Sequence, residues 1–196
     1  MNRPSIEDIK RVMKESGMKV FTAPFDVTLG GIRTKDNASG KFNDWIFAIL
    51  PTGGGGELSV VLPGTTDAGL YYREHPINPD GTAIIQHGIQ HPGAYTYMEK
   101  GGHKGQEAFR QTGNMKYWRD ADRDKYLDFD GEEYNDIFNT NGHDMGDRGV
   151  DVGKWSAGCW GSTRENMDIL YEIAKLQIKH GPGSRFSFAM LHEDMF

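Results

Sequence analysis

The stretch TRENMDILYEIAKLQIKHGPGSRFSFAML, residues 163–191, decides the fold that the sequence predicts. Its first part predicts a helix over residues 163–179 that Gly181 ends, because apolar side chains recur at helical spacing. Its last part, residues 185–191, predicts a strand. An apolar face as wide as this one predicts a helix that packs on a sheet. The face consists of Met167, Ile169, Leu170, Tyr171, Ile173, Ala174, Leu176 and Ile178.

The rest of the chain is rich in glycine, with 26 among 196 residues, which favours turns and short strands. A short helix is expected between Ser5 and Gly17. Gly30-Gly31 predicts a turn or bulge, and residues 65–71 predict a turn that enters a strand. Together these patterns predict one β-rich α+β domain. The other expected strands are residues 20–29, 42–50, 58–62, 82–86, 94–98 and 116–119.

Composition and charge argue against several kinds of partner and location. The formal net charge is −6 and no run of Lys and Arg occurs, so we expect no nucleic-acid partner. No apolar run of about 18 residues is present, so we expect no membrane span and no membrane partner. Residues 1–20 are charged throughout and lack the apolar segment of a secretory signal, which predicts synthesis in the cytoplasm without a signal peptide.

Cys159 is the only cysteine, which excludes an internal disulfide and every zinc site built from several cysteines. A single cysteine is most often a small buried hydrophobe. This one, however, ends the segment Trp155-Ser156-Ala157-Gly158-Cys159, in which the small residues let the backbone turn sharply and leave the sulfur accessible. A nucleophilic cysteine needs a base that forms the thiolate, and His143 lies a short glycine-containing loop upstream.

These residue types fit acyl transfer by a thiol. In that chemistry the thiolate attacks a carbonyl group, and water or an amine then resolves the thioester. We expect His143 to act as the base and Ser156 to orient the turn or to hydrogen-bond the histidine. The backbone amides of Gly158 and Cys159 are expected to form an oxyanion hole.

Two further patterns concern metals. Asp120, Asp122 and Asp124 resemble the start of a calcium loop. Lys125 occupies the sixth position instead of glycine, and Gly131 the twelfth instead of glutamate, which favours a solvated acidic turn and leaves calcium there open. A zinc site of three histidines is conceivable, but no His-Glu-x-x-His spacing supports it, so we expect no metal. We also expect no cofactor.

The order of several short motifs resembles one protein family. The Cys159 segment, with a histidine and a glycine-rich loop before it, resembles the L,D-transpeptidase (YkuD-like) catalytic domain. A closer likeness is to phage-encoded relatives with a Trp-Ser-Ala-Gly-Cys motif, and it runs from about residue 31 to the C-terminus. The matching motifs are Gly31-Ile32-Arg33, Phe42-Asn43-Asp44-Trp45, residues 66–71 and 78–84, His103-Lys104-Gly105, residues 119–124 and Trp155-Ser156-Ala157-Gly158-Cys159.

The resemblance implies a single-domain mixed β-sheet sandwich with the cysteine in a cleft. It implies a catalytic domain over residues 31–196 and an N-terminal extension of helix and strand over residues 1–30. The implied substrate is the stem peptide of peptidoglycan, and the activity is that of an L,D-peptidase or a transpeptidase. A phage relative is expected to degrade the cell wall, as an endolysin or a virion-associated hydrolase. It would reach the periplasm or wall through the phage lysis machinery or as a virion component, with other virion proteins as partners.

Three departures from the family pattern concern the site. The position two residues after the cysteine, often Arg or Asn in the family, is Gly161, so Arg164 is the nearest candidate for binding a substrate carboxylate. The Cys-Gln-Val of the phage relatives is Cys-Trp-Gly at residues 159–161. Their histidine follows an Asn-Ile pair; Asn141 could occupy the register of that histidine, with His143 displaced by two residues.

The sequence leaves two other hypotheses open. The departures fit a catalytically degenerate virion structural or wall-binding protein that keeps the fold, and the missing signal peptide fits a cytoplasmic acyltransferase with an unrelated substrate. A thiol with an ordinary pKa of about 8.5 and slow alkylation would favour the degenerate protein. The expected substrate contacts are Trp155, Trp160, Arg164, His103 and Asn141.

Overall fold

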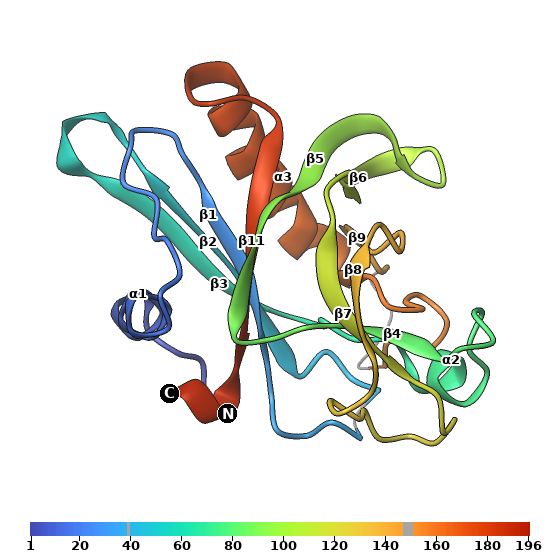
Figure 1. Ribbon diagram of the computed structural model, residues 1–196. Helices are drawn as coiled ribbons and strands as arrows, with labels where there is room; N and C mark the ends of the chain where they lie inside the picture. Colours follow the sequence, from blue (N-terminus) through green and yellow to red (C-terminus); the bar gives the residue numbers. More distant parts are fainter. Residues whose placement is uncertain (39, 147–150) are drawn as a thin grey trace.

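The computed structural model describes residues 1–38, 40–146 and 151–196. Over these residues the chain forms a β-rich α+β fold with an eight-stranded mixed sheet, a three-stranded sheet and three α-helices (Figure 1). The helices are α1 (Ile6–Glu15), α2 (Leu70–Glu74) and α3 (Arg164–His180). The strands are β1 (Thr28–Arg33), β2 (Asp44–Pro51), β3 (Glu57–Gly64), β4 (Thr82–Ile85), β5 (Ile89–His103), β6 (Gln106–Gln111), β7 (Met115–Asp120), β8 (Glu133–Asp136), β9 (Asn141–Asp144), β10 (Trp160–Ser162) and β11 (Arg185–His192).

The large sheet has the strand order β10-β9-β6-β5-β11-β1-β2-β3 and the small sheet the order β4-β7-β8. In the large sheet, β1 runs parallel to β11 and β9 parallel to β10, whereas the other neighbours are antiparallel. The two edges of the large sheet meet, because Thr65, directly after β3, exchanges backbone hydrogen bonds of 2.8 and 2.9 Å with Gly161 of β10. The sheet therefore curves back on itself next to the segment that carries Cys159.

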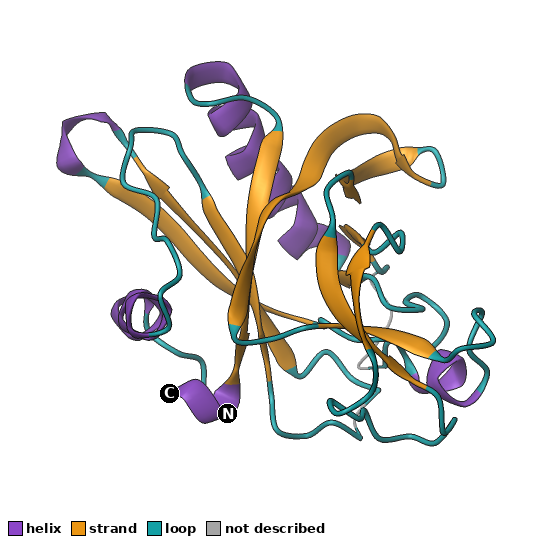
Figure 2. Cartoon of the chain, viewed as in Figure 1, coloured by secondary structure: helices purple, strands orange, loops and turns teal. Residues whose placement is uncertain are grey.

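The two longer helices cover opposite faces of the large sheet (Figure 2). Side chains of β2 alternate between the faces, as the pleat requires. Ile46 and Leu50 join the core that contains the apolar face of α3, and Phe47 and Ile49 join the core that contains α1. This arrangement confirms the predicted C-terminal helix packed on the sheet.

Two turn predictions are wrong. Gly30 and Gly31 lie inside β1, and the turn at residues 65–71 leads into α2 and not into a strand. A Cβ on Gly30 would lie 2.3 Å from the Ala189 carbonyl oxygen and 2.4 Å from the Phe47 ring, so close packing between strands requires this glycine. Because β1 spans residues 30 and 31, the expected boundary between extension and domain falls within a strand of the main sheet.

Several predictions that rest on local sequence patterns are confirmed. Ser5 caps α1, since its hydroxyl accepts the Asp8 amide at 3.1 Å, and Gly17 follows the helix with a φ of +72°. The hairpin of β2 and β3 and the final strand β11 lie where the sequence predicts them. No helix in the described part of the chain is long and apolar enough to cross a membrane.

A buried ionic network holds the turn after β3. Arg33 Nη2 lies 2.7 Å from Asp67 Oδ1, and both side chains are buried. The carboxylate of Asp44 accepts hydrogen bonds from the amide and the hydroxyl of Thr66, both at 2.8 Å. These contacts fix the turn from which Thr65 reaches β10.

Trp160 is a core residue. Its side chain is fully buried and stacks on Phe188, with ring centroids 4.9 Å apart. The indole fills the space beside Gly142, where a Cβ would lie 2.1 Å from Trp160 Cζ2. This placement does not fit the expected contact with substrate, because the side chain points from β10 into the core, whereas Trp155 is 51% exposed.

We expect Trp160→Ala to lower the free energy of unfolding by about 3–5 kcal/mol, because it leaves a cavity in a packed core. Trp155→Ala removes the same side chain from a half-exposed position and serves as the control, with an expected loss below about 1 kcal/mol. Urea denaturation followed by circular dichroism measures both losses. Equal losses for the two variants would contradict the structural role given to Trp160.

Candidate active site

A cleft with a volume of about 510 Å³ lies beside Cys159. Part of its wall comes from the small sheet, through Thr82 of β4 and Arg119 of β7. His103, at the end of β5, and Trp155 line it as well. The cleft therefore brings together both sheets and the segment that precedes β10.

Ser156 closes the turn that presents Cys159. Its buried hydroxyl accepts the Gly158 amide at 3.1 Å and donates to the Cys159 carbonyl oxygen at 2.7 Å. Gly158 has a φ of +129°, which favours glycine, and its carbonyl oxygen accepts the Thr140 hydroxyl at 2.8 Å. Of the two roles expected for Ser156, these bonds show the orientation of the turn; within the described residues its hydroxyl bonds no histidine.

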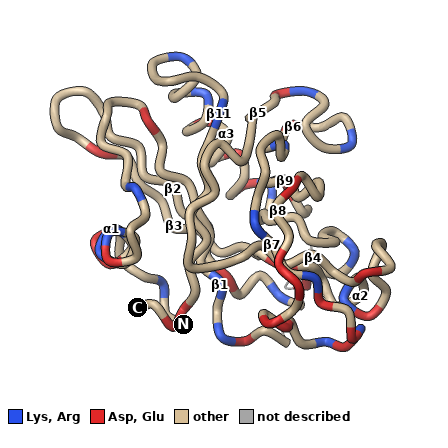
Figure 3. Tube along the Cα trace, viewed as in Figure 1, with Lys and Arg blue, Asp and Glu red and all other residues tan. Residues whose placement is uncertain are grey.

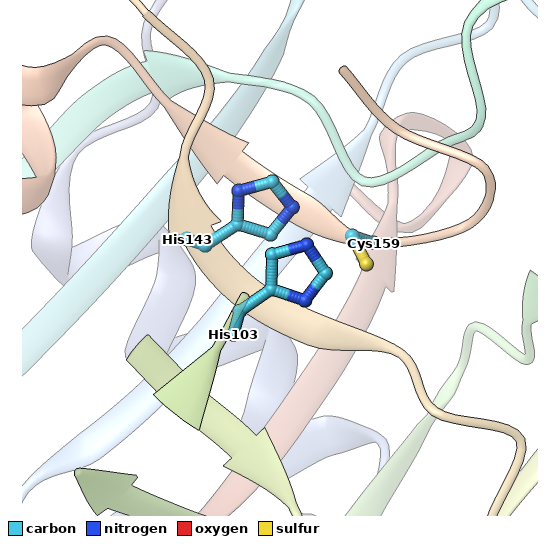
Figure 4. Close-up of side chains that lie close together, drawn as sticks. All are labelled: His103, His143 and Cys159. Carbon is cyan, nitrogen blue, oxygen red and sulfur yellow. The ribbon is translucent and has the colours of Figure 1, made fainter. Parts of the chain in front are cut away.

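The parallel pairing of β9 and β10 brings His143 next to Cys159. Gly161, two residues after the cysteine, lies opposite His143 in the register. One ring nitrogen of His103, one of His143 and the sulfur of Cys159 all lie within 4.8 Å of one another. Figure 4 shows the two imidazole rings face to face beside the sulfur. The structure thus places the predicted base beside the predicted nucleophile.

The hydrogen bonds of His143 leave Nε2 as its proton acceptor. Nδ1 lies 2.7 Å from the carbonyl oxygen of Asp144, and since a carbonyl only accepts, Nδ1 carries the proton of the neutral ring. Nε2 is buried and has no hydrogen-bond partner among the described residues. Burial, with smaller effects of His103 and Lys104, lowers the pKa of His143 to about 4. The ring is therefore neutral at pH 7, with its lone pair on Nε2.

The thiol of Cys159 is neutral as well. The residue is 9% exposed, and this burial raises the pKa of the thiol to about 11. The Asn141 amide, which donates to Sγ at 3.4 Å, and the charge of Lys104 lower this pKa by less. Thiol and imidazole thus lie beside each other as an uncharged pair.

His103 and Asn141, both expected substrate contacts, lie beside the pair. The His103 ring stacks on the His143 ring, with centroids 4.2 Å apart and an interplanar angle of 10°. Nδ1 of His103 lies 3.2 Å from Asn141 Nδ2, which can only donate, so this nitrogen accepts. Asn141 therefore contacts the sulfur through its backbone and orients His103 through its side chain.

Arg164 does not line the cleft. Its Nη2 forms an ion pair of 2.5 Å with Asp144 Oδ2 at the start of α3. Asp144 directly follows His143, so Arg164 is placed to hold the end of β9 and not to bind a carboxylate in the cleft. Trp155, in contrast, lies in the cleft wall as expected.

Three cationic side chains whose role the sequence did not predict line the cleft: Lys104, Arg119 and Lys154. Arg119 Nη1 donates to the Gly81 carbonyl oxygen at 2.8 Å, and Lys154 Nζ lies 3.8 Å from the centre of the Tyr71 ring. Among the described residues no carboxylate lines this cleft. The cleft therefore favours an anionic group. Because the three cations come from separate segments of the chain, no local pattern could identify them.

The cluster of His103, His143 and Cys159 also has the ligand chemistry of zinc, which binds imidazole nitrogen and thiolate sulfur. A metal there would bind the thiolate, and its binding would release the proton of the thiol. The sequence predicts no metal at these residues.

Comparison with known proteins assigns the chain to no family. No protein-family model, curated protein or solved structure matches it. The function has to be inferred from the geometry of the site and from the motifs in the sequence.

We expect the rate of Cys159 alkylation by iodoacetamide to rise about tenfold per pH unit between about pH 7 and pH 10, because the thiolate fraction rises in this way below a pKa of about 11. Mass spectrometry of the intact protein measures the rate. The urea-unfolded protein is the control, and its rate should level off above about pH 8.5. A plateau that begins below about pH 8 in the folded protein would contradict the neutral thiol.

Proposed function

We propose that this chain is a cysteine-dependent acyl-enzyme that acts on peptidoglycan stem peptides, as an L,D-peptidase or a transpeptidase, and that it degrades cell wall in the manner of a phage enzyme. One observation carries the proposal: Cys159 lines the cleft, and beside it lies His143, whose Nε2 is buried and has no hydrogen-bond partner among the described residues. An unpartnered imidazole nitrogen beside a thiol supports acyl transfer.

In the proposed reaction, Sγ of Cys159 attacks the carbonyl carbon of the scissile amide while its proton passes to Nε2 of His143. The tetrahedral adduct collapses to a thioester as the C–N bond breaks, and the imidazolium gives its proton to the leaving amine. Water then hydrolyses the thioester and releases the thiol. In transpeptidation, the amine of a second stem peptide takes the place of water.

The developing oxyanion needs donors next to the sulfur. The sequence points to the amides of Gly158 and Cys159. The Gly158 amide is already bonded to the Ser156 hydroxyl, so we assign the contact to the Cys159 amide. Ser156 then contributes by keeping the turn in place.

The charge of the cleft supports a stem peptide as the substrate. Stem peptides carry several carboxylates, and Lys104, Arg119 and Lys154 face the cleft without a competing carboxylate among the described residues. The order of the sequence motifs, which resembles that of phage-encoded L,D-transpeptidase relatives, points to the same substrate class.

The packing around Trp160 supports His143 as the family's histidine. The relatives have Ile before their histidine and Gln after their cysteine, whereas this chain has Gly142 and Trp160 at those positions if His143 is the histidine. The indole of Trp160 occupies the volume that a side chain on residue 142 would need. The two departures therefore compensate for each other in the register that keeps His143, and not Asn141, as the base.

A second candidate is a catalytically degenerate virion structural or wall-binding protein with the same fold. The raised pKa of Cys159, about 11, favours it, because a buried protonated thiol is a weak nucleophile. The two candidates differ in whether the protein changes the covalent structure of muropeptides.

We expect wild type to remove D-alanine from meso-diaminopimelate-type muropeptides, to cleave their cross-links or to form 3-3 cross-links, as mass spectrometry would show. Cys159→Ala and His143→Ala should each lower the rate by a factor on the order of 10³ or more, because each removes a partner of the proton transfer. His180→Ala, at the end of α3, is the control and should keep the rate. Unchanged muropeptides with wild type, at a concentration that binds cell wall, would favour the degenerate protein.

We expect Lys154→Met to raise KM for an acidic stem peptide about fivefold with little change in kcat, because it removes one exposed cation that attracts the substrate. Lys179→Met, on the exposed end of α3, removes the same charge away from the cleft and should leave KM unchanged. Steady-state kinetics with the acidic peptide and with its fully amidated form measure the effect. The same increase in KM for both peptides would show that charge is not the cause.

A further inference from the structure

A cluster of three carboxylates lies where β7 ends. Asp120 is the last residue of β7, and Asp122 and Asp128 belong to the loop that follows. One carboxylate oxygen of each lies within 4.8 Å of those of the other two. Figure 3 shows acidic segments gathered near the end of β7. Three negative charges at this distance repel one another, and a cation between them would relieve that repulsion.

The burial of the Asp120 side chain is a second, independent observation that points to a cation. Its side chain is 3% exposed, and both of its carboxylate oxygens are buried without a hydrogen-bond partner among the described residues. Burial and the nearby carboxylates of Asp122 and Asp128 raise the pKa of this carboxyl group, which disfavours its charged form. A buried carboxylate with no donor is costly, because its charge has lost water and gained nothing in exchange. A cation held between the three carboxylates would remove this cost.

We propose that Asp120, Asp122 and Asp128 bind a hard divalent cation, which we infer to be calcium. Calcium takes six to eight oxygen ligands in flexible geometry, so three carboxylates can be completed by backbone carbonyl groups and water. The proposed ligands differ from the Asp-x-Asp-x-Asp pattern of the sequence. Asp124, the third member of that pattern, instead uses Oδ1 to accept the Tyr126 amide at 2.6 Å, and so shapes the loop.

Contacts outside the cluster hold the loop in position. Asn37 Nδ2 donates to the Leu127 carbonyl oxygen at 3.2 Å, and the Leu127 side chain is buried. Arg73 Nη1 donates to the Lys125 carbonyl oxygen at 2.8 Å. These bonds attach the loop to residues from other segments of the chain, so more than sequence spacing holds the proposed ligands in place.

The position of the cluster connects the proposed ion to the cleft. Asp120 pairs with Thr82 in the ladder of β4 and β7. Thr82 and Arg119, the residue before Asp120, both line the cleft. An ion at the end of β7 would therefore stabilise one wall of the cleft without contacting Cys159. This inference rests on the carboxylate cluster alone and stands whether or not the protein is an enzyme.

The test uses the full chain after treatment with EDTA and gel filtration, titrated with CaCl₂ and, separately, with MgCl₂ in a calorimeter. We expect one saturable calcium site per chain with a Kd below about 1 mM, and weaker binding of magnesium, which demands near-octahedral geometry. At a hundredfold excess of calcium over Kd, the midpoint of thermal unfolding should rise by about 5–10 °C.

Substitutions distinguish a defined calcium site from a general attraction of calcium to the acidic loop. Asp120→Asn keeps the size of the side chain and removes a ligand charge, and it should weaken calcium binding at least about tenfold. Asp128→Asn, on the exposed side of the cluster, provides a second variant if Asp120→Asn does not fold. Asp130→Asn removes the same charge from the same loop outside the cluster and should bind as wild type does.

Three results would overturn the proposal. The first is the absence of saturable binding to wild type with either ion. The second is an equal loss of affinity in Asp130→Asn and Asp120→Asn, which would indicate attraction by the acidic loop as a whole. The third is loss of calcium binding in Cys159→Ala, which would place the ion at the thiol.

Discussion

The packing of Trp160 against Gly142 is the contact on which the candidate active site depends. β10 has only three residues, so its few hydrogen bonds to β9 need the support of a buried side chain, and the indole supplies it. One register position further along, a Cβ on Gly161 would lie 2.0 Å from the His143 carbonyl oxygen. Glycine at residue 142 leaves room for the indole, and glycine at residue 161 avoids a collision with the backbone of His143. The pairing of β9 and β10 that these glycines permit is what brings His143 next to Cys159.

Burial favours the uncharged form of both His143 and Cys159. It lowers the pKa of His143 to about 4 and raises that of Cys159 to about 11. The groups that oppose this effect at the sulfur are the Asn141 amide and the charge of Lys104. Lys104 has two effects, because the same charge that favours the thiolate disfavours the imidazolium. Both groups are therefore uncharged at neutral pH, although they lie close together.

A sequence-based expectation is correct more often when its physical cause lies within one short segment of the chain. The helices α1 and α3, the β2–β3 hairpin and β11 could be predicted because periodicity and end residues lie within one segment. Gly30-Gly31 looked like a turn, but its glycines are required by Ala189 and Phe47, which no local pattern connects to them. The expectation that Trp160 contacts substrate fails in the same way. The space for its side chain in the core is left by Gly142, which lies on another strand.

The sequence by itself determined the β-rich α+β class, the helix on the sheet, and Cys159 and His143 as a candidate pair, because all of these depend on residue types and short spacings. Only the tertiary structure decided that the pair is buried and uncharged, that Arg164 binds Asp144, and that three cations face the cleft. It also decided which aspartates cluster at the end of β7. Each of these properties depends on the distance between groups that the chain brings together from separate segments, and on the water that packing removes from around them.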